Sequence, residues 1–155
     1  MLRLDQETRD AIVAHARRDH PDEACGIVAG PEGSDRAERF VPMVNAASSP
    51  TFYEFDPTDL LHLYRDLDDR GEEPVVVYHS HTATEAYPSR TDIGLAMEPN
   101  AHYVLVSTRH LTFDADGNSD GPVEFRSYRI VDGAVTEEEV VVEPTTAHTE
   151  PRSQD

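Results

Sequence analysis

Residues 74–81 read Pro-Val-Val-Val-Tyr-His-Ser-His, and this stretch predicts the centre of the fold. The apolar, β-branched run indicates a buried strand. Because alternate residues of a strand point to the same face, His79 and His81 should present two imidazoles on one side of its end. After a short loop, Ser89 begins a helical pattern and places Asp92 in the first turn. Two imidazoles and one carboxylate suit a catalytic zinc, which leaves its fourth position open.

Other interpretations of the same residues remain open. The two histidines can be hydrogen-bonded residues at a strand end, and Ser89-x-x-Asp92 can be a capping box that only starts a helix. A cupin-type site is a further alternative, because three residues separate His81 from Glu85. The glycines that flank a cupin motif are missing from this stretch, which makes that alternative the weakest.

The spacing resembles the signature of JAMM (MPN-plus) zinc metallopeptidases, in which His-Ser-His is followed after seven residues by Ser-x-x-Asp. The upstream segment from Glu23 to Gly30 (Glu-Ala-Cys-Gly-Ile-Val-Ala-Gly) is similar to the segment that carries the family's catalytic glutamate. The likeness runs from the first helix to the last strand. It is strongest to a bacterial branch of small stand-alone enzymes, and residues 126–133 (Arg-Ser-Tyr-Arg-Ile-Val-Asp-Gly) strengthen that match.

The resemblance implies a specific chemistry. His79, His81 and Asp92 would hold one zinc ion per chain, which would acidify water at the open position. Glu23 would act as the general base and return the proton to the leaving amine. Ser89 would donate a hydrogen bond to the developing oxyanion, a contribution of roughly 3 kcal/mol in enzymes that use such donors.

The resemblance also implies a fold and a partner. The fold would be of the α/β (α+β) class, with a curved, mostly antiparallel sheet flanked by helices in the JAMM/MPN (cytidine-deaminase-like) architecture. The substrate would be a ubiquitin-like sulfur-carrier protein with a Gly-Gly C-terminus, from which the enzyme would release an added cysteine. Alternatives are the removal of another residue or a lysine conjugate, and a non-catalytic MPN scaffold. The sequence does not predict the oligomeric state.

Composition limits the possible partners and the number of domains. The 155 residues include 31 acidic and 13 basic side chains, for a formal net charge of −18. So acidic a surface repels nucleic-acid backbones and anionic membranes. The length predicts one domain over residues 1–143, followed by a Pro/Thr/Ser-rich tail over 144–155 that we expect to be disordered. No apolar leader or membrane span is evident, so a cytoplasmic location is expected.

The single cysteine, Cys25, excludes an internal disulfide and a cysteine-rich zinc module. It falls in an apolar strand, where it should act as a small buried hydrophobic residue.

The remaining elements follow from caps, turns and periodicity. Asp5 should cap a helix over 6–19, with His15 and His20 in solvent, and Asp56-Pro57 should open a second helix. That second helix should bury Leu60, Leu61, Tyr64 and Leu67. Further strands are predicted over 25–29, 37–44, 102–107, 123–131 and 134–142, the last two joined by Asp132-Gly133. Pro42 suggests an edge strand or a bulge, and residues 109–121 should form a loop. His102 has no spacing that assigns it to the zinc site.

Overall fold

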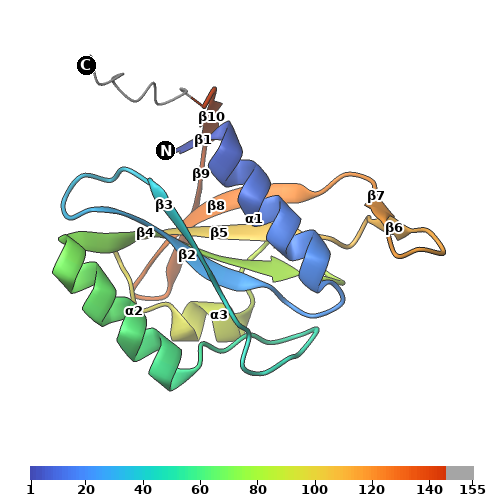
Figure 1. Cartoon of the computed structure of the whole chain (residues 1–155), viewed down its shortest axis with the longest axis horizontal. Helices are drawn as coiled ribbons and strands as arrows, with labels where there is room; N and C mark the ends of the chain where they lie inside the picture. Colours follow the sequence, from blue (N-terminus) through green and yellow to red (C-terminus); the bar gives the residue numbers. More distant parts are fainter. Residues whose placement is uncertain (146–155) are drawn as a thin grey trace, which may run out of the picture.

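Six strands form the central sheet in a computed structural model that describes residues 1–145 (Figure 1). Residues 146–155, most of the tail predicted to be disordered, lie outside the described residues. The helices are α1 (Gln6–Asp19), α2 (Pro57–Arg70) and α3 (Arg90–Leu95). The strands are β1 (Leu2–Asp5), β2 (Cys25–Pro31), β3 (Arg39–Met43), β4 (Glu72–His81), β5 (His102–Ser107), β6 (Thr112–Phe113), β7 (Ser119–Asp120), β8 (Glu124–Val131), β9 (Ala134–Glu138) and β10 (Val140–Glu143).

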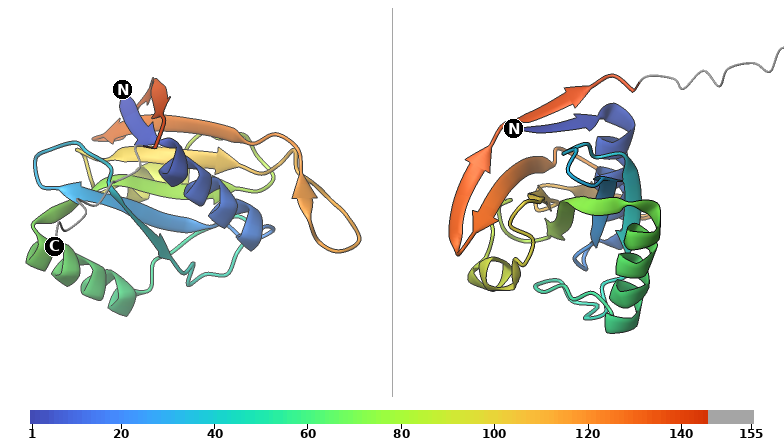
Figure 2. Two further views of the ribbon diagram at one scale, coloured as in Figure 1. Left: turned by 45° about the horizontal axis from the view of Figure 1, so that its top comes forward. Right: turned by 90° about the vertical axis from the view of Figure 1, so that its left-hand side faces the viewer.

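The central sheet runs in the order β3-β2-β4-β5-β8-β9 and is antiparallel except between β4 and β5. Figure 2 shows its strands curving between the helices, which confirms the expected curved, mostly antiparallel sheet. The parallel pair requires a crossover connection. That crossover leaves β4 directly after His81 and contains α3, so it brings Asp92 back towards the two histidines.

The two faces of the sheet bury separate apolar clusters. Helix α1 covers one face, and α2 and α3 lie on the other (Figures 1 and 2). Along β4, Val76 and Tyr78 pack in the cluster beneath α1, whereas Val77 packs in the cluster beneath α2. The alternation continues into the motif, so His79 and His81 follow Val77 onto the face that α2 and α3 share.

The helices begin where the sequence predicted. The Asp5 carboxylate accepts from the Thr8 amide, and that of Asp56 accepts from the Thr58 and Asp59 amides. Gly71 ends α2 in the left-handed conformation, with φ of 65°. The edge position of β3, which contains Pro42, is also confirmed.

The predicted buried stripe of α2 was partly wrong. Leu63 and Leu67 are buried, whereas Leu61 and Tyr64 are 49% and 39% exposed. Leu60 packs at the edge of the same cluster. Positions 60, 63 and 67 form one helical face, and Leu61 lies a third of a turn away from Leu60, towards solvent.

The expected exposure of His15 and His20 was also wrong. His15 is 4% exposed, its Nδ1 lies 2.7 Å from the Tyr78 hydroxyl, and its Nε2 lies 3.0 Å from the Asp19 carboxylate. His20 is half-buried, and its Nδ1 lies 2.7 Å from the Thr108 hydroxyl. A polar residue on a helix can be buried when its partners come from the sheet, which local periodicity does not reveal.

The chain ends and the long loop contain strands that the sequence did not predict. β1 pairs in parallel with β10, so the predicted strand over 134–142 is divided into β9 in the central sheet and β10 outside it. The loop over 109–121 contains the short antiparallel pair β6–β7, which projects from the molecule in Figure 1. Within residues 1–145, no helix is long and apolar enough to cross a membrane.

Candidate metal centre

The end of β4 and the start of α3 bring three side chains to one point. The Nε2 atoms of His79 and His81 each lie 3.1 Å from Oδ2 of Asp92. One possible ligand atom from each of these residues lies within 4.8 Å of the others. Two imidazole nitrogens and a carboxylate oxygen at such separations can bind a single ion.

The capping box at the start of α3 is compatible with this arrangement. The Ser89 hydroxyl oxygen accepts from the Asp92 amide at 3.1 Å, and the Ser89 amide donates to Asp92 Oδ2 at 2.8 Å. Asp92 therefore contacts both the helix terminus and the two imidazoles. Ser89 is exposed, and its hydroxyl hydrogen remains available to donate because the oxygen acts as the acceptor.

His79 is buried without the hydrogen bonds that a structural histidine would make. It is 3% exposed, and neither ring nitrogen has a hydrogen-bond partner within residues 1–145. Asp92 Oδ2 is close to Nε2, but its direction does not suit a hydrogen bond. Unpaired buried nitrogens are costly, and a metal ion would satisfy the Nε2 lone pair. The environment of His79 therefore favours a metal ligand over a hydrogen-bonded strand-end histidine.

His81 is oriented by its other ring nitrogen. Nδ1 lies 2.9 Å from the carbonyl oxygen of Glu85 and 3.2 Å from the Thr84 hydroxyl. Because a carbonyl can only accept, Nδ1 donates to it, and this bond fixes the ring with Nε2 directed towards Asp92. Metal-binding histidines are commonly oriented by such a second hydrogen bond.

Burial and mutual contact shift the pKa values of the three residues. Burial lowers the pKa of His79. Burial alone would lower the pKa of His81, but the bonds to Asp92 and the Glu85 carbonyl raise it. Burial alone would raise the pKa of Asp92, but the contacts with His79 and His81 lower it well below its usual range. Asp92 is therefore ionised at neutral pH, which favours a cation at this point.

Glu23 lies just before β2 and is 4% exposed. Burial raises the pKa of its carboxyl to about 7, with a smaller opposing effect of His81 and a further increase from Asp92. A carboxyl group that titrates near neutral pH can both accept and return a proton. The adjacent Asp22, the competing acid at this corner, is less buried than Glu23.

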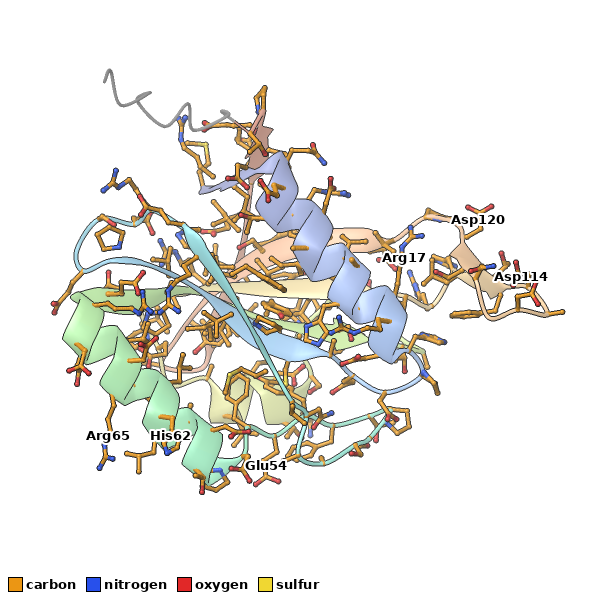
Figure 3. All side chains as sticks on the ribbon, viewed as in Figure 1. Arg17, Glu54, His62, Arg65, Asp114 and Asp120 are labelled. Atoms are coloured by element: carbon orange, nitrogen blue, oxygen red, sulfur yellow. The ribbon has the colours of Figure 1, made fainter. Side chains whose placement is uncertain are left out.

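The cupin-type ligand set is not assembled. The Glu85 side chain is exposed, and its carboxylate lies 3.7 Å from the Arg126 guanidinium. Only the backbone oxygen of Glu85 contacts His81. His62 lies on the exposed side of α2 near Arg65, away from the site (Figure 3).

An apolar cavity of about 280 Å³ approaches the site through Tyr53, which lines the cavity and packs against His79. Phe52, Tyr53, Leu63, Leu95, Met97 and Tyr103 are among the residues that line it. The Tyr53 ring also stacks on His79, with 4.4 Å between the ring centroids. The aromatic residues Phe52, Tyr53 and Phe55 all line this cavity, so they form one of its walls.

Comparison with known proteins agrees with the geometry. The family model described as prokaryotic homologues of the JAB domain matches residues 5–131. The CysO-cysteine peptidase of Mycobacterium tuberculosis is 65% identical over 133 residues, which cover 86% of this chain and 85% of the relative. The desampylase of Haloferax volcanii is 33% identical over 111 residues, covering 68% of this chain and 80% of the relative.

A solved structure extends the likeness to the whole fold. The solution structure of protein DSY2949 from Desulfitobacterium hafniense has a TM-score of 0.76 and 30% sequence identity, and the match covers 96% of this chain and 97% of that one. The family match includes β2, β4 and α3, the elements that position Glu23, His79, His81 and Asp92. This chain therefore belongs to the family of prokaryotic homologues of the JAB domain, and it is a peptidase.

Proposed function

We propose that the protein is a zinc-dependent peptidase that hydrolyses the amide between the C-terminal glycine of a ubiquitin-like sulfur carrier and an added cysteine. The observation that carries this proposal is the convergence of His79 and His81 on Asp92 at 3.1 Å, close enough to the buried Glu23 for His81 and Asp92 to influence the pKa of its carboxyl. The choice of substrate is supported by 65% identity to a CysO-cysteine peptidase over most of both chains.

His79, His81 and Asp92 would hold the zinc ion. Their donor set, two imidazoles and a carboxylate, is the kind that catalytic zinc sites use. When bound, zinc supplies Lewis acidity, which polarises a carbonyl and acidifies water. The ring orientation fixed by the Glu85 carbonyl keeps the His81 lone pair directed into the site.

Two further residues would handle the proton and the developing charge. Glu23, with its raised pKa, would take a proton from the attacking water and return it to the leaving amine. Ser89 would donate its hydroxyl hydrogen to the oxygen of the scissile carbonyl as that oxygen becomes negative. These roles require no covalent bond between the enzyme and the carrier.

The apolar cavity beside Tyr53 offers a place for the carrier's tail. Its wall contacts the imidazole of His79, so a peptide lying along it would approach the candidate metal centre. Glycines at the end of the tail would permit close backbone approach, because they have no side chain.

The test is to incubate the purified protein with a carrier–cysteine adduct and follow the mass of the carrier. We expect loss of one cysteine residue, inhibition by a chelator, and recovery when zinc is restored. Glu23→Gln is the matched control, since it should retain zinc while its turnover falls to a small residual rate. An unchanged mass with the zinc-loaded protein would refute the proposed substrate, and chelator-resistant cleavage would refute the metal.

A second substrate class is supported by the likeness to a desampylase. A carrier joined through its C-terminal glycine to a lysine side chain presents a similar glycyl amide. Offering both adducts at equal concentration would separate the two candidates, and preferential cleavage of the lysine conjugate would favour the second.

A further inference from the structure

Ser80, the residue between the two histidines of the motif, connects their strand to the segment that carries Glu23. Its hydroxyl oxygen accepts from the Ala24 amide at 2.8 Å, and its own amide donates to the Ala24 carbonyl oxygen at 3.0 Å. Ser80 is 1% exposed and Ala24 is fully buried. Both hydrogen bonds are therefore shielded from water, so water cannot replace the partner if either bond is lost.

These bonds extend the pairing of β2 and β4 beyond its regular end. The last paired residues of the ladder are Cys25 and His79. Ser80 continues the connection for one more residue, up to Ala24, which directly follows Glu23. Because strand side chains alternate, His79 and His81 face the metal side while the Ser80 side chain is free to contact the backbone of the neighbouring segment.

The other backbone bonds of Glu23 come from a different part of the chain. The Glu23 amide donates to the Ser49 carbonyl oxygen at 2.9 Å, and its carbonyl accepts from the Asn45 side chain at 3.1 Å. Both partners belong to the loop after β3. These bonds hold Glu23 against that loop, whereas the Ser80 bonds connect the next residue, Ala24, to the strand that carries both imidazoles.

We propose that Ser80 is a positioning residue that sets the distance between the Glu23 carboxyl and the two histidines. This inference rests on the proposed function of Glu23 as the base. Without the hydroxyl, the buried Ala24 amide loses its acceptor, and the start of β2 must shift to find another. Proton transfer depends on placement, and a displacement of about 1 Å can reduce a rate by about 100-fold.

The principal test is Ser80→Ala in the zinc-loaded protein. We expect kcat to fall roughly 10- to 100-fold, the range seen when residues that orient a metal site are changed. KM should change less than about twofold and bound zinc should stay near one ion per chain, because neither the cavity nor the three candidate ligands are altered. Ser80→Thr retains the hydroxyl and should restore most of the turnover.

A double-mutant cycle with Glu23→Gln tests whether Ser80 acts through Glu23. Once Glu23 cannot accept a proton, Ser80→Ala should cause no further loss in kcat. A merely structural role would instead lower the remaining activity by the same factor in both backgrounds.

Hydrogen–deuterium exchange gives a readout without metal or substrate. In the metal-free protein the Ala24 amide should exchange slowly, and Ser80→Ala should accelerate it. Ser127→Ala is the matched control. Ser127 lies on β8, is fully buried, and donates to Glu138 Oε1 at 2.9 Å. We expect Ser127→Ala to lower stability but leave Ala24 exchange and kcat unchanged.

Several outcomes would overturn the inference. Wild-type kcat in Ser80→Ala, additive losses in the cycle, or unchanged Ala24 exchange would each show that Ser80 does not position Glu23. If Ser80→Ala does not fold, Ser80→Cys provides the same test, since sulfur is only a weak acceptor. An inactive wild-type protein would refute the proposed function, while the exchange experiment would still decide whether the Ser80 bonds hold Ala24.

Discussion

Two buried histidine clusters contain similar residues and have opposite character. At the candidate metal centre, His79 and His81 direct Nε2 towards one oxygen of Asp92, and neither nitrogen of His79 has a hydrogen-bond partner in the described chain. At the start of β5, the fully buried His102 contacts Asp35 through Nε2, at 2.7 Å, and Glu138 through Nδ1.

The difference lies in which atoms remain unpaired. Both ring nitrogens of His102 face carboxylates, and Arg129 lies beside Glu138, with 3.3 Å between Nε and Oε2. In that cluster each ring nitrogen of His102 has a carboxylate partner, so neither nitrogen is directed at an open point. The other cluster directs two imidazole Nε2 atoms at one ionised carboxylate oxygen, without a cationic side chain between them in the described chain. Proximity of histidine and carboxylate is therefore not sufficient to indicate a metal site.

Removing the carboxylate of the first cluster should have the largest effect. Asp92→Ala should lower bound zinc from about one ion per chain to a small fraction and abolish turnover, because only two protein ligands remain. Metal analysis after gel filtration, together with the carrier mass assay, measures both. Unchanged zinc content would mean that Asp92 caps α3 without binding metal.

Removing the carboxylate of the second cluster should alter stability instead. Glu138→Ala leaves the buried His102 and the partly exposed Arg129 without their shared partner, which should cost at most roughly 3 to 5 kcal/mol of unfolding free energy. Zinc content should remain that of the wild type. Thermal or urea unfolding gives the stability change. Loss of zinc from folded Glu138→Ala would contradict the expectation that this cluster has no effect on metal binding.

The pH dependence of the metal-free protein should have opposite signs at Glu23 and Glu138. Because the folded pKa of Glu23 is raised from 4.5 to about 7, its stabilising contribution is complete below pH 4.5 and is lost as the pH rises through 7, by at most roughly 3 kcal/mol. Glu23→Gln should therefore increase stability at pH 8 and have little effect near pH 4.

At Glu138, burial alone would raise the pKa, but the bond to His102 outweighs it and lowers the pKa below 4.5. Its contribution is present above pH 4.5 and is lost as the pH falls through the folded value. Glu138→Gln should therefore be most destabilising at neutral pH. Urea unfolding at several pH values measures the stability of both variants. If the stability change varied with pH in the same way in both, the opposite signs expected for Glu23 and Glu138 would be contradicted.

The smallest expected effect concerns the orientation of His81. Thr84→Ala removes a contact at 3.2 Å from Nδ1, but the Glu85 carbonyl still accepts from that nitrogen at 2.9 Å. The loss should be about 1 kcal/mol, or roughly a fivefold weaker zinc affinity, measured by competition with a chelator. A loss of more than about 100-fold would show that Thr84, rather than Glu85, fixes the ring.

Local signals predicted the helix starts correctly, and the three residues that they marked as candidate ligands lie together in the structure. Asp5, Asp56 and Ser89 accept from amides two or three residues further along, so their roles are visible in a short window of sequence. His79 and His81 share a face because of strand alternation alone. Asp92 lies close to both histidines because the connection from β4 to α3 is short.

Features that depend on distant partners were missed or predicted wrongly. His15 seemed to belong to a solvated helix face, because Tyr78, its buried partner, lies 63 residues away. The pairing of β1 with β10 joins the two ends of the described chain, and no local pattern marks a parallel pair of such separation. Leu63 rather than Leu61 is buried because the face of α2 that carries Leu60, Leu63 and Leu67 packs against the sheet.

The amino-acid sequence by itself determined which residues can bind a metal, because alternation and capping depend on neighbours in the chain. The tertiary structure decided which histidines keep an unpaired nitrogen, where the apolar cavity lies, and that Ser80 joins the Glu23 segment to the strand of ligands. These properties arise from contacts across the sheet. Water cannot reach the buried groups there, so each unpaired polar atom costs free energy and each hydrogen bond contributes to stability.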